Sequence, residues 1–330
     1  MDNSAETHLL RALREASPGW VSGQELGREA GVSRAAISKR IRKLLAQGFE
    51  VESSPRKGYR LLRADVRLTP GEMARGLATC RFYRHPFHIK EVTQSTNDDL
   101  RVLAEQGAPE GTVVFAEVQR AGRGRRGRSW FSRPGDAVQF SLLLRPPIRP
   151  GEGTLIPLMA ATAVYRTLRN LGVEGVEIKW PNDVLIEGRK VCGILCEMSV
   201  SLEGIEYAML GVGLNVSTPE EAFPPELRDA ACSLVSATGK PWSRPQVWLE
   251  ILKELAPLID LLWKGEREEI LEGWRQGAVS PGQEVELRSA NGDVTRGRVQ
   301  GVNEEGALQL LLPDGTLRTF HSGEVSLRPA

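Results

Sequence analysis

The pattern of apolar residues changes twice along this 330-residue chain, and each change indicates a different kind of fold. Up to about residue 63, apolar residues recur at helical spacing before a short strand hairpin. From 64 to 275, strand-like and helix-like segments alternate. Helices are expected to begin near Thr69, at the cap Ser95 and over 155–171, and strands are expected at 191–198 and 207–212, among others. From 276 to 330, short strands are separated by Asn-Gly, Glu-Gly and Asp-Gly turns. We therefore expect an α/β (α+β) protein with three domains: 1–63, 64–275 and 276–330.

The N-terminal segment has the signals of a winged helix-turn-helix. Ser22 is a helix cap, Gly31 ends that helix, and Ser33 caps the next one. Two short helices joined by a glycine-containing turn are typical of a helix-turn-helix. The run from 49 to 61 then predicts a β-hairpin, which would be the wing.

Local charge supports nucleic-acid binding by this segment. Residues 1–63 hold twelve Lys and Arg against seven Asp and Glu, although the whole chain has a net charge of only +1. A recognition helix needs cations for phosphates and short polar side chains near its start. The alternative is a solvated basic helix of a protein–protein module. The candidate DNA-contacting residues are Ser33, Arg34, Ser38, Lys39, Arg40, Arg42, Arg56 and Lys57.

The stretch Gly122–Trp130, GRGRRGRSW, fits G-x-G-x-x-G literally. A dinucleotide-binding turn would need a helix directly after it, but the sequence runs into Pro134 and then another strand. The dinucleotide interpretation is therefore rejected. Five arginines between 120 and 128 instead indicate a loop that binds an anion, with glycines that let the backbone approach it. We expect this loop to be disordered alone and to close over its ligand; a basic surface loop for RNA or a partner is the alternative.

Three further motifs carry candidate chemistry. In Lys179–Val184, KWPNDV, the Asp183 carboxylate could hold Mg²⁺ or position an arginine, although an ordinary hairpin turn is equally compatible. Lys190 lies at the start of an apolar strand. Its positive charge would suit a carboxylate that reacts with a phosphate, but a lysine at this position could also be a solvated edge residue. Glycines 211 and 213 permit close approach of a ligand, and Asn215 could bind a base or a phosphate.

Other classes of protein are disfavoured. The N-terminus lacks the apolar core of a signal peptide, and no apolar run approaches the roughly 18 residues of a membrane span. The four cysteines lack zinc-site spacing, so we expect buried reduced thiols. A cytoplasmic protein without membrane contact is the expectation.

The loop GRGRRGRSW, the turn KWPNDV, and the strands KVCGILCE and GVGLNV, in this order, resemble the biotin–protein ligase family. The N-terminal helix-turn-helix is similar to that of the bifunctional subgroup, which also represses biotin-synthesis genes. The resemblance covers nearly the whole chain. It implies a mixed-sheet ligase domain of the class II aminoacyl-tRNA-synthetase/biotin-ligase type, followed by a small SH3-like β-barrel.

The resemblance also implies a two-step reaction. Biotin and ATP, with Mg²⁺, would form biotinyl-5′-AMP, and the biotin would pass to a lysine of the biotin carboxyl carrier protein of acetyl-CoA carboxylase. The adenylate would act as corepressor, favour a homodimer and so direct binding to operator DNA. The alternatives are a DNA-binding biotin sensor, a lipoate-type ligase and a ligase without repressor function.

Site residues follow from the same resemblance. Ser95, Thr96 and Gln119 would hold the ureido ring of biotin. The expected catalytic residues are Lys190, Arg123, Arg125 and Asp183, of which Asp183 is also a candidate metal ligand. Further biotin-binding residues would be Asn97, Gly122, Gly124, Arg123, Arg125, Trp130, Lys190 and Gly193. The expected adenylate contacts are Arg126, Trp130, Asn182, Asn215 and Arg328. The segment 217–232 resembles a second mobile loop over the adenine, to which Phe223 would add apolar cover.

Overall fold

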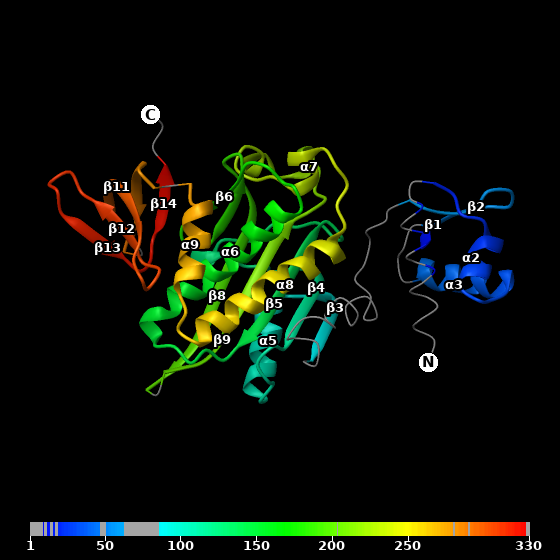
Figure 1. Cartoon of the computed structure of the whole chain (residues 1–330), viewed down its shortest axis with the longest axis horizontal. Coiled ribbons are helices and arrows are strands. Elements are labelled where there is room, and N and C mark those ends of the chain that lie inside the picture. Colours follow the sequence, from blue (N-terminus) through cyan, green and yellow to red (C-terminus); the bar gives the residue numbers. More distant parts are fainter. Residues whose placement is uncertain are drawn as a thin grey trace. The chain divides into compact units, whose positions relative to one another are not determined.

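The computed structural model describes residues 9, 12–13, 16, 19–46, 51–62, 86–202, 204–279, 281–289 and 291–327. The chain divides into two compact units (Figure 1). One comprises residues 1–79 with 242–249, and the other residues 80–241 with 250–330. The helix expected to start near Thr69 lies outside the described residues.

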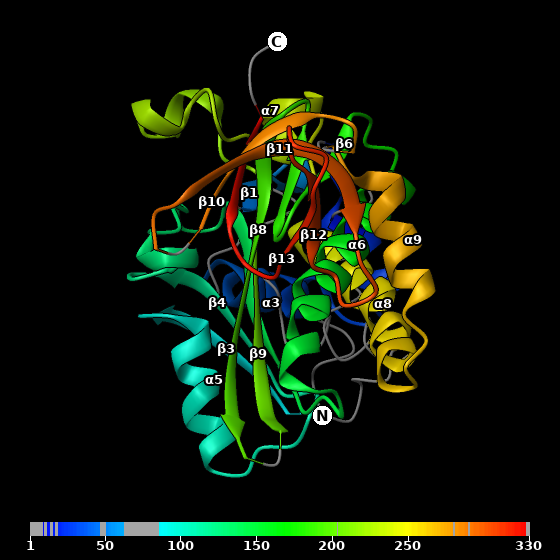
Figure 2. The ribbon, with the colours of Figure 1, turned by 90° about the vertical axis from the view of Figure 1, so that its left-hand side faces the viewer.

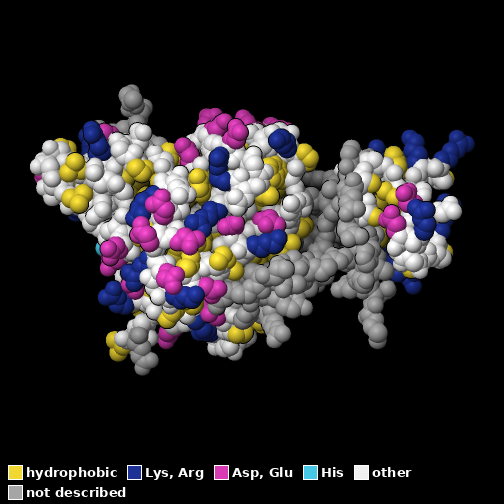
Figure 3. Space-filling view, in the orientation of Figure 1, with side chains coloured by type: hydrophobic (Ala, Val, Ile, Leu, Met, Phe, Trp, Pro, Cys, Tyr) yellow, Lys and Arg dark blue, Asp and Glu magenta, His cyan; other side chains and the backbone are white. Residues whose placement is uncertain are grey.

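The smaller unit contains the helix-turn-helix and its hairpin. Its elements are α2 (Gly23–Glu29), α3 (Arg34–Ala46), β1 (Val51–Ser54) and β2 (Gly58–Leu61). Ser22 and Ser33 cap the two helices, because their Oγ atoms accept hydrogen bonds from Glu25 N at 3.1 Å and Ala36 N at 3.2 Å. The strands β1 and β2 pair antiparallel, as expected of the wing. Figure 3 shows Lys and Arg side chains projecting from the surface of this unit.

The larger unit is built on a seven-stranded mixed sheet of order β3-β4-β5-β9-β8-β7-β6. Only β3 and β4 pair in parallel, and the remaining pairs are antiparallel. The expected strands are present, and β8 and β9 are longer than predicted because they form one extended hairpin. The strands are β3 (Phe87–Thr93), β4 (Val113–Gln119), β5 (Ala137–Leu144), β6 (Val176–Lys179), β7 (Asp183–Ile186), β8 (Arg189–Ser201) and β9 (Gly204–Asn215).

Helices cover both faces of this sheet. Figure 2 shows α5 on one side and α6 and α9 on the other. On the first face, Leu100 and Ala104 of α5 pack with Val114, Leu143 and Met209. On the second face, the apolar helix predicted near 155–171 is present as α6, which contacts β6 and β8. The helices are α5 (Thr96–Glu105), α6 (Leu155–Asn170), α7 (Leu234–Thr238), α9 (Glu268–Gly277) and α8 (Arg244–Trp263), of which residues 250–263 belong to the larger unit.

The C-terminal strands form a five-stranded antiparallel sheet of order β13-β12-β11-β10-β14. Its turn at 303–307 is attached to the turn between β6 and β7 of the seven-stranded sheet, because Trp180 Nε1 donates to Gly306 O at 3.1 Å. Together these elements confirm the expected α/β class with a helix-turn-helix, a mixed sheet and C-terminal antiparallel strands. The strands are β10 (Glu284–Arg288), β11 (Val294–Val302), β12 (Leu308–Leu311), β13 (Leu317–Phe320) and β14 (Glu324–Leu327).

Acidic and basic side chains are interspersed over the visible face of the larger unit (Figure 3). Among the described residues, no helix has the length and apolar character needed to cross a bilayer.

Candidate functional site

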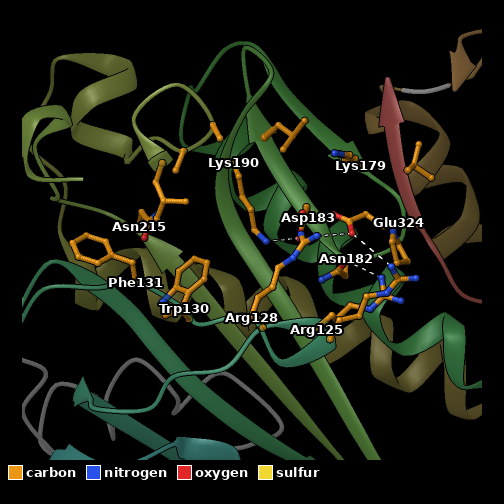
Figure 4. A pocket seen from close by; sticks show the side chains of 18 of the residues that line it. Arg125, Arg128, Trp130, Phe131, Lys179, Asn182, Asp183, Lys190, Asn215 and Glu324 are labelled. Carbon is orange, nitrogen blue, oxygen red and sulfur yellow. Dashed lines mark hydrogen bonds and ion pairs between the residues drawn. The ribbon is translucent and has the colours of Figure 1, made fainter. Parts of the chain in front are cut away.

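Two adjoining cavities lie beside the mixed sheet. The larger has a volume of about 400 Å³ and the narrower one about 50 Å³. Figure 4 shows Lys190 and Asp183 facing each other in the larger cavity. Because five residues line both cavities, the two form one continuous site. The shared residues are Gly124, Arg125, Trp130, Asn182 and Lys190.

The far end of the narrow cavity is lined by neutral polar groups. Gln119 Oε1 accepts hydrogen bonds from Thr96 N at 2.8 Å and from Thr96 Oγ1 at 3.1 Å. Its Nε2 donates to Gln139 Oε1 at 2.9 Å. Ser95 was expected to cap α5, but its side chain makes no cap hydrogen bond and lines the cavity instead. Neutral donors and acceptors of this kind suit an uncharged polar heterocycle.

A buried row of polar side chains leads away from this end. Ser141 Oγ lies 2.7 Å from Thr96 Oγ1 and 2.5 Å from Asn97 Oδ1. Asn97 Nδ2 then donates to Glu197 Oε2 at 2.7 Å. No sequence motif indicates Gln139, Ser141 or Glu197, because each lies within a strand pattern that predicts only burial or exposure.

The arginine loop leaves β4 without entering an α-helix, so the structure agrees with the rejection of a dinucleotide turn. Its backbone closes on itself, because Trp130 N donates to Gly122 O at 2.8 Å and Gly124 N to Arg128 O at 2.7 Å. The expectation that this loop is disordered alone and closes over its ligand stays a prediction. Groups of the chain itself contact the arginines.

The arginines of the loop contact different parts of the chain. Arg123 forms a bidentate ion pair with Asp98, in which Nη1 and Nη2 each donate to one carboxylate oxygen at 2.6 Å. Arg125 Nη1 donates to Asn182 Oδ1 at 3.3 Å and to Gly323 O at 3.1 Å. At the C-terminal sheet, Glu324 pairs with Arg128 at 2.6 Å, and Arg126 Nη2 donates to Arg288 O at 2.8 Å.

These contacts and burial shift the pKa values of three charged groups at the loop. The hydrogen bond from Arg123 lowers the pKa of Asp98, and the hydrogen bond from Arg128 lowers the pKa of Glu324. Burial, followed by repulsion from Arg126, lowers the pKa of Arg125. A guanidinium partly removed from water interacts more strongly with an incoming anion than an exposed one does.

Trp130 explains two glycines of the strands beneath it. A Cβ added at Gly213 would lie 2.7 Å from Trp130 Cε2, and one at Gly193 would lie 3.1 Å from Trp130 Cζ3. The glycines of GVGLNV were expected to admit a ligand, and at Gly213 the group that approaches is this indole. Lys190 Nζ lies 5.9 Å from the centroid of the same ring.

The Asp183 carboxylate is a candidate ligand for a magnesium ion at the junction of the two cavities. Asp183 there pairs with Lys190 at 2.7 Å. Within the described ranges there is no group of three or more His, Cys, Asp or Glu side chains that could hold a metal. Because Mg²⁺ is commonly held by one or two carboxylates with substrate phosphates, Asp183 fits a metal that arrives with a nucleotide.

The larger cavity ends in an apolar wall formed by the segment 217–232. Phe223 is 2% exposed, and its ring lies 5.9 Å from that of Phe131. The segment has two short turns, η4 (Glu220–Ala222) and η5 (Pro225–Leu227), and is tied to β8 because Cys232 N donates to Lys190 O at 2.9 Å. Asn215 Nδ2 donates to Cys232 O at 3.1 Å.

The remaining predicted residues lie elsewhere. Arg328 is outside the described residues. In the smaller unit, the predicted DNA-contacting residues at the start of α3, along it and at the wing turn are mostly exposed. Ser33, Arg34, Lys39, Arg42, Arg56 and Lys57 are exposed, and Ser38 and Arg40 are half-buried.

Three family models match the chain. Residues 89–215 match the biotin/lipoate A/B protein ligase family, residues 6–60 match an HTH domain, and residues 282–328 match the biotin protein ligase C terminal domain.

Curated relatives match over nearly the full length. The bifunctional ligase/repressor BirA of Bacillus subtilis (strain 168) is 34% identical, with 99% of this chain and 100% of the relative covered. The protein of the same name from Escherichia coli (strain K12) is 30% identical, with 100% and 99% covered. Among solved structures, biotin protein ligase from Aquifex aeolicus in complex with biotin and ATP has a TM-score of 0.64 at 30% identity. That alignment covers 74% of this chain and 99% of the other.

Proposed function

This chain belongs to the biotin–protein ligase family, and we propose that it activates biotin with ATP and transfers it to a lysine of a biotin carboxyl carrier protein. The observation that carries the proposal is the pair of cavities joined at Lys190. The neutral polar end suits the ureido ring, and the larger cavity suits the nucleotide. The reacting carboxylate and phosphate would then meet where the cations lie.

In the first step, an oxygen of the biotin carboxylate attacks the α-phosphorus of ATP. The bond from that phosphorus to the bridging oxygen breaks, and pyrophosphate leaves. Lys190 and Arg125 would offset the negative charge that gathers on the phosphate, which is the main requirement of phosphoryl and nucleotidyl transfer. Asp183 would hold the Lys190 ammonium at the junction until the substrates arrive.

In the second step, the uncharged amine of the carrier lysine attacks the carbonyl carbon of biotinyl-5′-AMP. The bond to the phosphate oxygen breaks, AMP leaves, and the amine proton passes to solvent. No residue of the chain needs to become covalently attached. Bound Mg²⁺ would neutralise phosphate charge, with Asp183 as its protein ligand.

The roles of the lining residues remain proposals. Ser95, Thr96, Asn97 and Gln119 would hold the ureido ring, and the loop from Gly122 to Arg126 would cover the valeryl chain and phosphates. Trp130 and Asn182 line both cavities, and Gly193 lines the narrow one. Asn215, with Phe131 and Phe223, would enclose the adenylate; Arg328 is proposed for that side from the resemblance.

We also propose that the chain represses biotin-synthesis genes. The helix-turn-helix match and the exposed cations of α3 and the wing support binding to operator DNA. Biotinyl-5′-AMP would act as corepressor by favouring a homodimer whose two recognition helices reach two half-sites. A cytoplasmic location, and the division into domains 1–63, 64–275 and 276–330, belong to the same proposal.

Two assays test this account. The purified chain, biotin, ATP and apo carrier protein should yield carrier with one added biotin, detected by mass; lipoate in place of biotin should yield none. DNA from upstream of biotin-synthesis genes should be bound tightly only when biotin and ATP are both present. A biotin sensor without ligase activity would leave the carrier unmodified, and a ligase without repressor function would leave DNA binding independent of both substrates.

A further inference from the structure

The arginine loop is a small hairpin with two stalks. An isolated β-bridge joins Arg123 to Ser129, and the loop tip, Arg125–Gly127, lies beyond it. One stalk ends at Trp130, whose ring lies against Gly213 of the sheet. The other stalk is attached through the Arg123 side chain. Both stalks are therefore held to the rest of the chain. The tip could move on its own, but the base of the loop can open only when one of these two contacts is released.

Two carboxylates from different elements hold Arg123. Asp98 in the first turn of α5 pairs with both terminal nitrogens at 2.6 Å. Glu197 of β8 lies 3.5 Å from Arg123 Nη2 through Oε2. Glu197 also pairs with Arg101 at 3.4 Å through its other oxygen. A fork between two carboxylates fixes the direction of the guanidinium as well as its position.

Glu197 is also the end of the polar row that begins in the narrow cavity. Its Oε2 accepts from Asn97 Nδ2, and Asn97 Oδ1 is 2.5 Å from Ser141 Oγ, which contacts Thr96. The sheet leaves room for this row, because a Cβ at Gly211 would lie 2.7 Å from Asn97 Oδ1. One carboxylate oxygen thus contacts both the residues around the proposed ureido pocket and the base of the loop.

We propose that Asp98 and Glu197 form a socket for Arg123 that positions the base of the arginine loop over the narrow cavity. Glu197, through Asn97, links the socket to the groups that hold the ring of the substrate. The proposal rests on the proposed function, since it assigns two positioning residues to that site. Neither side chain lines either of the two cavities described above, so both act through other residues.

The socket predicts an effect on biotin and not on ATP. Arg123 and Asn97 line the narrow cavity, whereas neither lines the larger one. In a variant that lacks one of the two carboxylates, the base of the loop is not held in place before biotin binds. Binding of biotin must then order it, which weakens the binding. Half-exposed ion pairs of this kind change an equilibrium by about fivefold. The KM for biotin should therefore rise about fivefold, with little change in kcat.

The test compares Asp98→Asn and Glu197→Gln with the parent in the full-length protein. Asp99→Asn is the matched control, because Asp99 follows Asp98 on α5 and lies outside the contacts of Arg123. Asp98→Glu is the conservative variant that keeps the charge. The first readout is the rate of tryptic cleavage within residues 120–130 without substrates. The second is the KM for biotin and for ATP in pyrophosphate–ATP exchange.

We expect cleavage about fivefold faster in Asp98→Asn and Glu197→Gln, a matching rise in the KM for biotin, and a KM for ATP within about twofold of the parent. Asp99→Asn should behave as the parent, and Asp98→Glu should recover most of the loss. Unchanged cleavage, an equal effect of Asp99→Asn, or equal rises in both KM values would overturn the socket. If the parent shows no biotin-dependent exchange, the proposed function fails, and cleavage still decides the socket.

Discussion

Lys190 Nζ lies 2.7 Å from Asp183 Oδ1 at the junction of the two cavities. The two residues are on neighbouring strands, and the register of β7 and β8 shifts between Val184 and Leu185. A β-bulge of this kind redirects a side chain that regular pairing would place elsewhere. Lys190 is therefore held inside the site, and is not the solvated edge lysine that its position at a strand start also allowed.

Asp183→Asn should slow adenylate formation. The amide removes the charge that holds the Lys190 ammonium, and with it the carboxylate proposed as a metal ligand at the junction. We expect kcat for pyrophosphate–ATP exchange to fall about tenfold or more, with little change in unfolding temperature. Glu187→Gln, an exposed carboxylate in the turn between the same strands, is the control. Activity of Asp183→Asn within twofold of the control would contradict this role.

Gly213→Ala should displace Trp130. The added methyl group would lie 2.7 Å from the indole, which is closer than van der Waals contact allows. Because the indole lines both cavities, the KM for biotin and the KM for ATP should both rise about tenfold or more. Gly151→Ala is the matched control, since nothing lies within 4 Å of its added Cβ. Kinetics equal to those of the control would show that Trp130 does not need this close approach.

Trp180→Phe should weaken the attachment of the C-terminal sheet to the turn that carries Asn182 and Asp183. The indole is 1% exposed, and its Nε1 donates to Gly306 O. Removing the donor leaves a buried carbonyl without this partner, which costs about 1–3 kcal/mol. Urea unfolding of the full chain measures this loss. A free energy of unfolding equal to that of the parent would show that the Trp180–Gly306 hydrogen bond does not stabilise this attachment.

Acid should release the base of the arginine loop. The pKa of Asp98 is lower in the folded chain because Arg123 donates to it, so the stabilisation it contributes is present above its unfolded-state pKa of about 3.9. That stabilisation is lost as the pH falls through the lower, folded-state value. The free energy of unfolding, measured by urea titration between pH 6 and 3, should therefore fall less steeply with decreasing pH in Asp98→Asn than in the parent. Equal slopes would contradict the pairing.

Native thiols should resist alkylation. Burial raises the pKa of Cys196 to about 12 and that of Cys232 to about 11, and it also raises the pKa of Cys192. Very little thiolate is therefore present at pH 8. Peptide mapping after iodoacetamide should find these three residues unmodified in the native protein and modified in denaturant. Rapid native labelling of Cys192 would be inconsistent with its buried position.

Local patterns were sufficient for the secondary structure. The cap at Ser33, the apolar face of α6 and the glycine-containing turns of the C-terminal strands each act within a few residues, and the structure confirms the corresponding elements. Motif resemblance brought Ser95, Gln119, Lys190 and Asn215 to one site, although their roles stay predictions.

Pairings between distant segments could not be read in the same way. Glu324 contacts an arginine 196 positions earlier, and Glu197 contacts a side chain 100 positions earlier. In both cases the local pattern predicts only a charged strand residue. Ser95 shows the converse, because its local pattern predicts a helix cap while the tertiary structure uses Gln119 to satisfy the adjacent Thr96 amide.

The central claim is that Lys190 supplies the charge on which adenylate formation depends. Biotin-dependent exchange of labelled pyrophosphate into ATP measures this step alone, without carrier protein or DNA. We predict exchange in the parent and a loss of about a hundredfold or more in Lys190→Ala, with unchanged folding by circular dichroism. Exchange in Lys190→Ala within a few-fold of the parent would contradict the account.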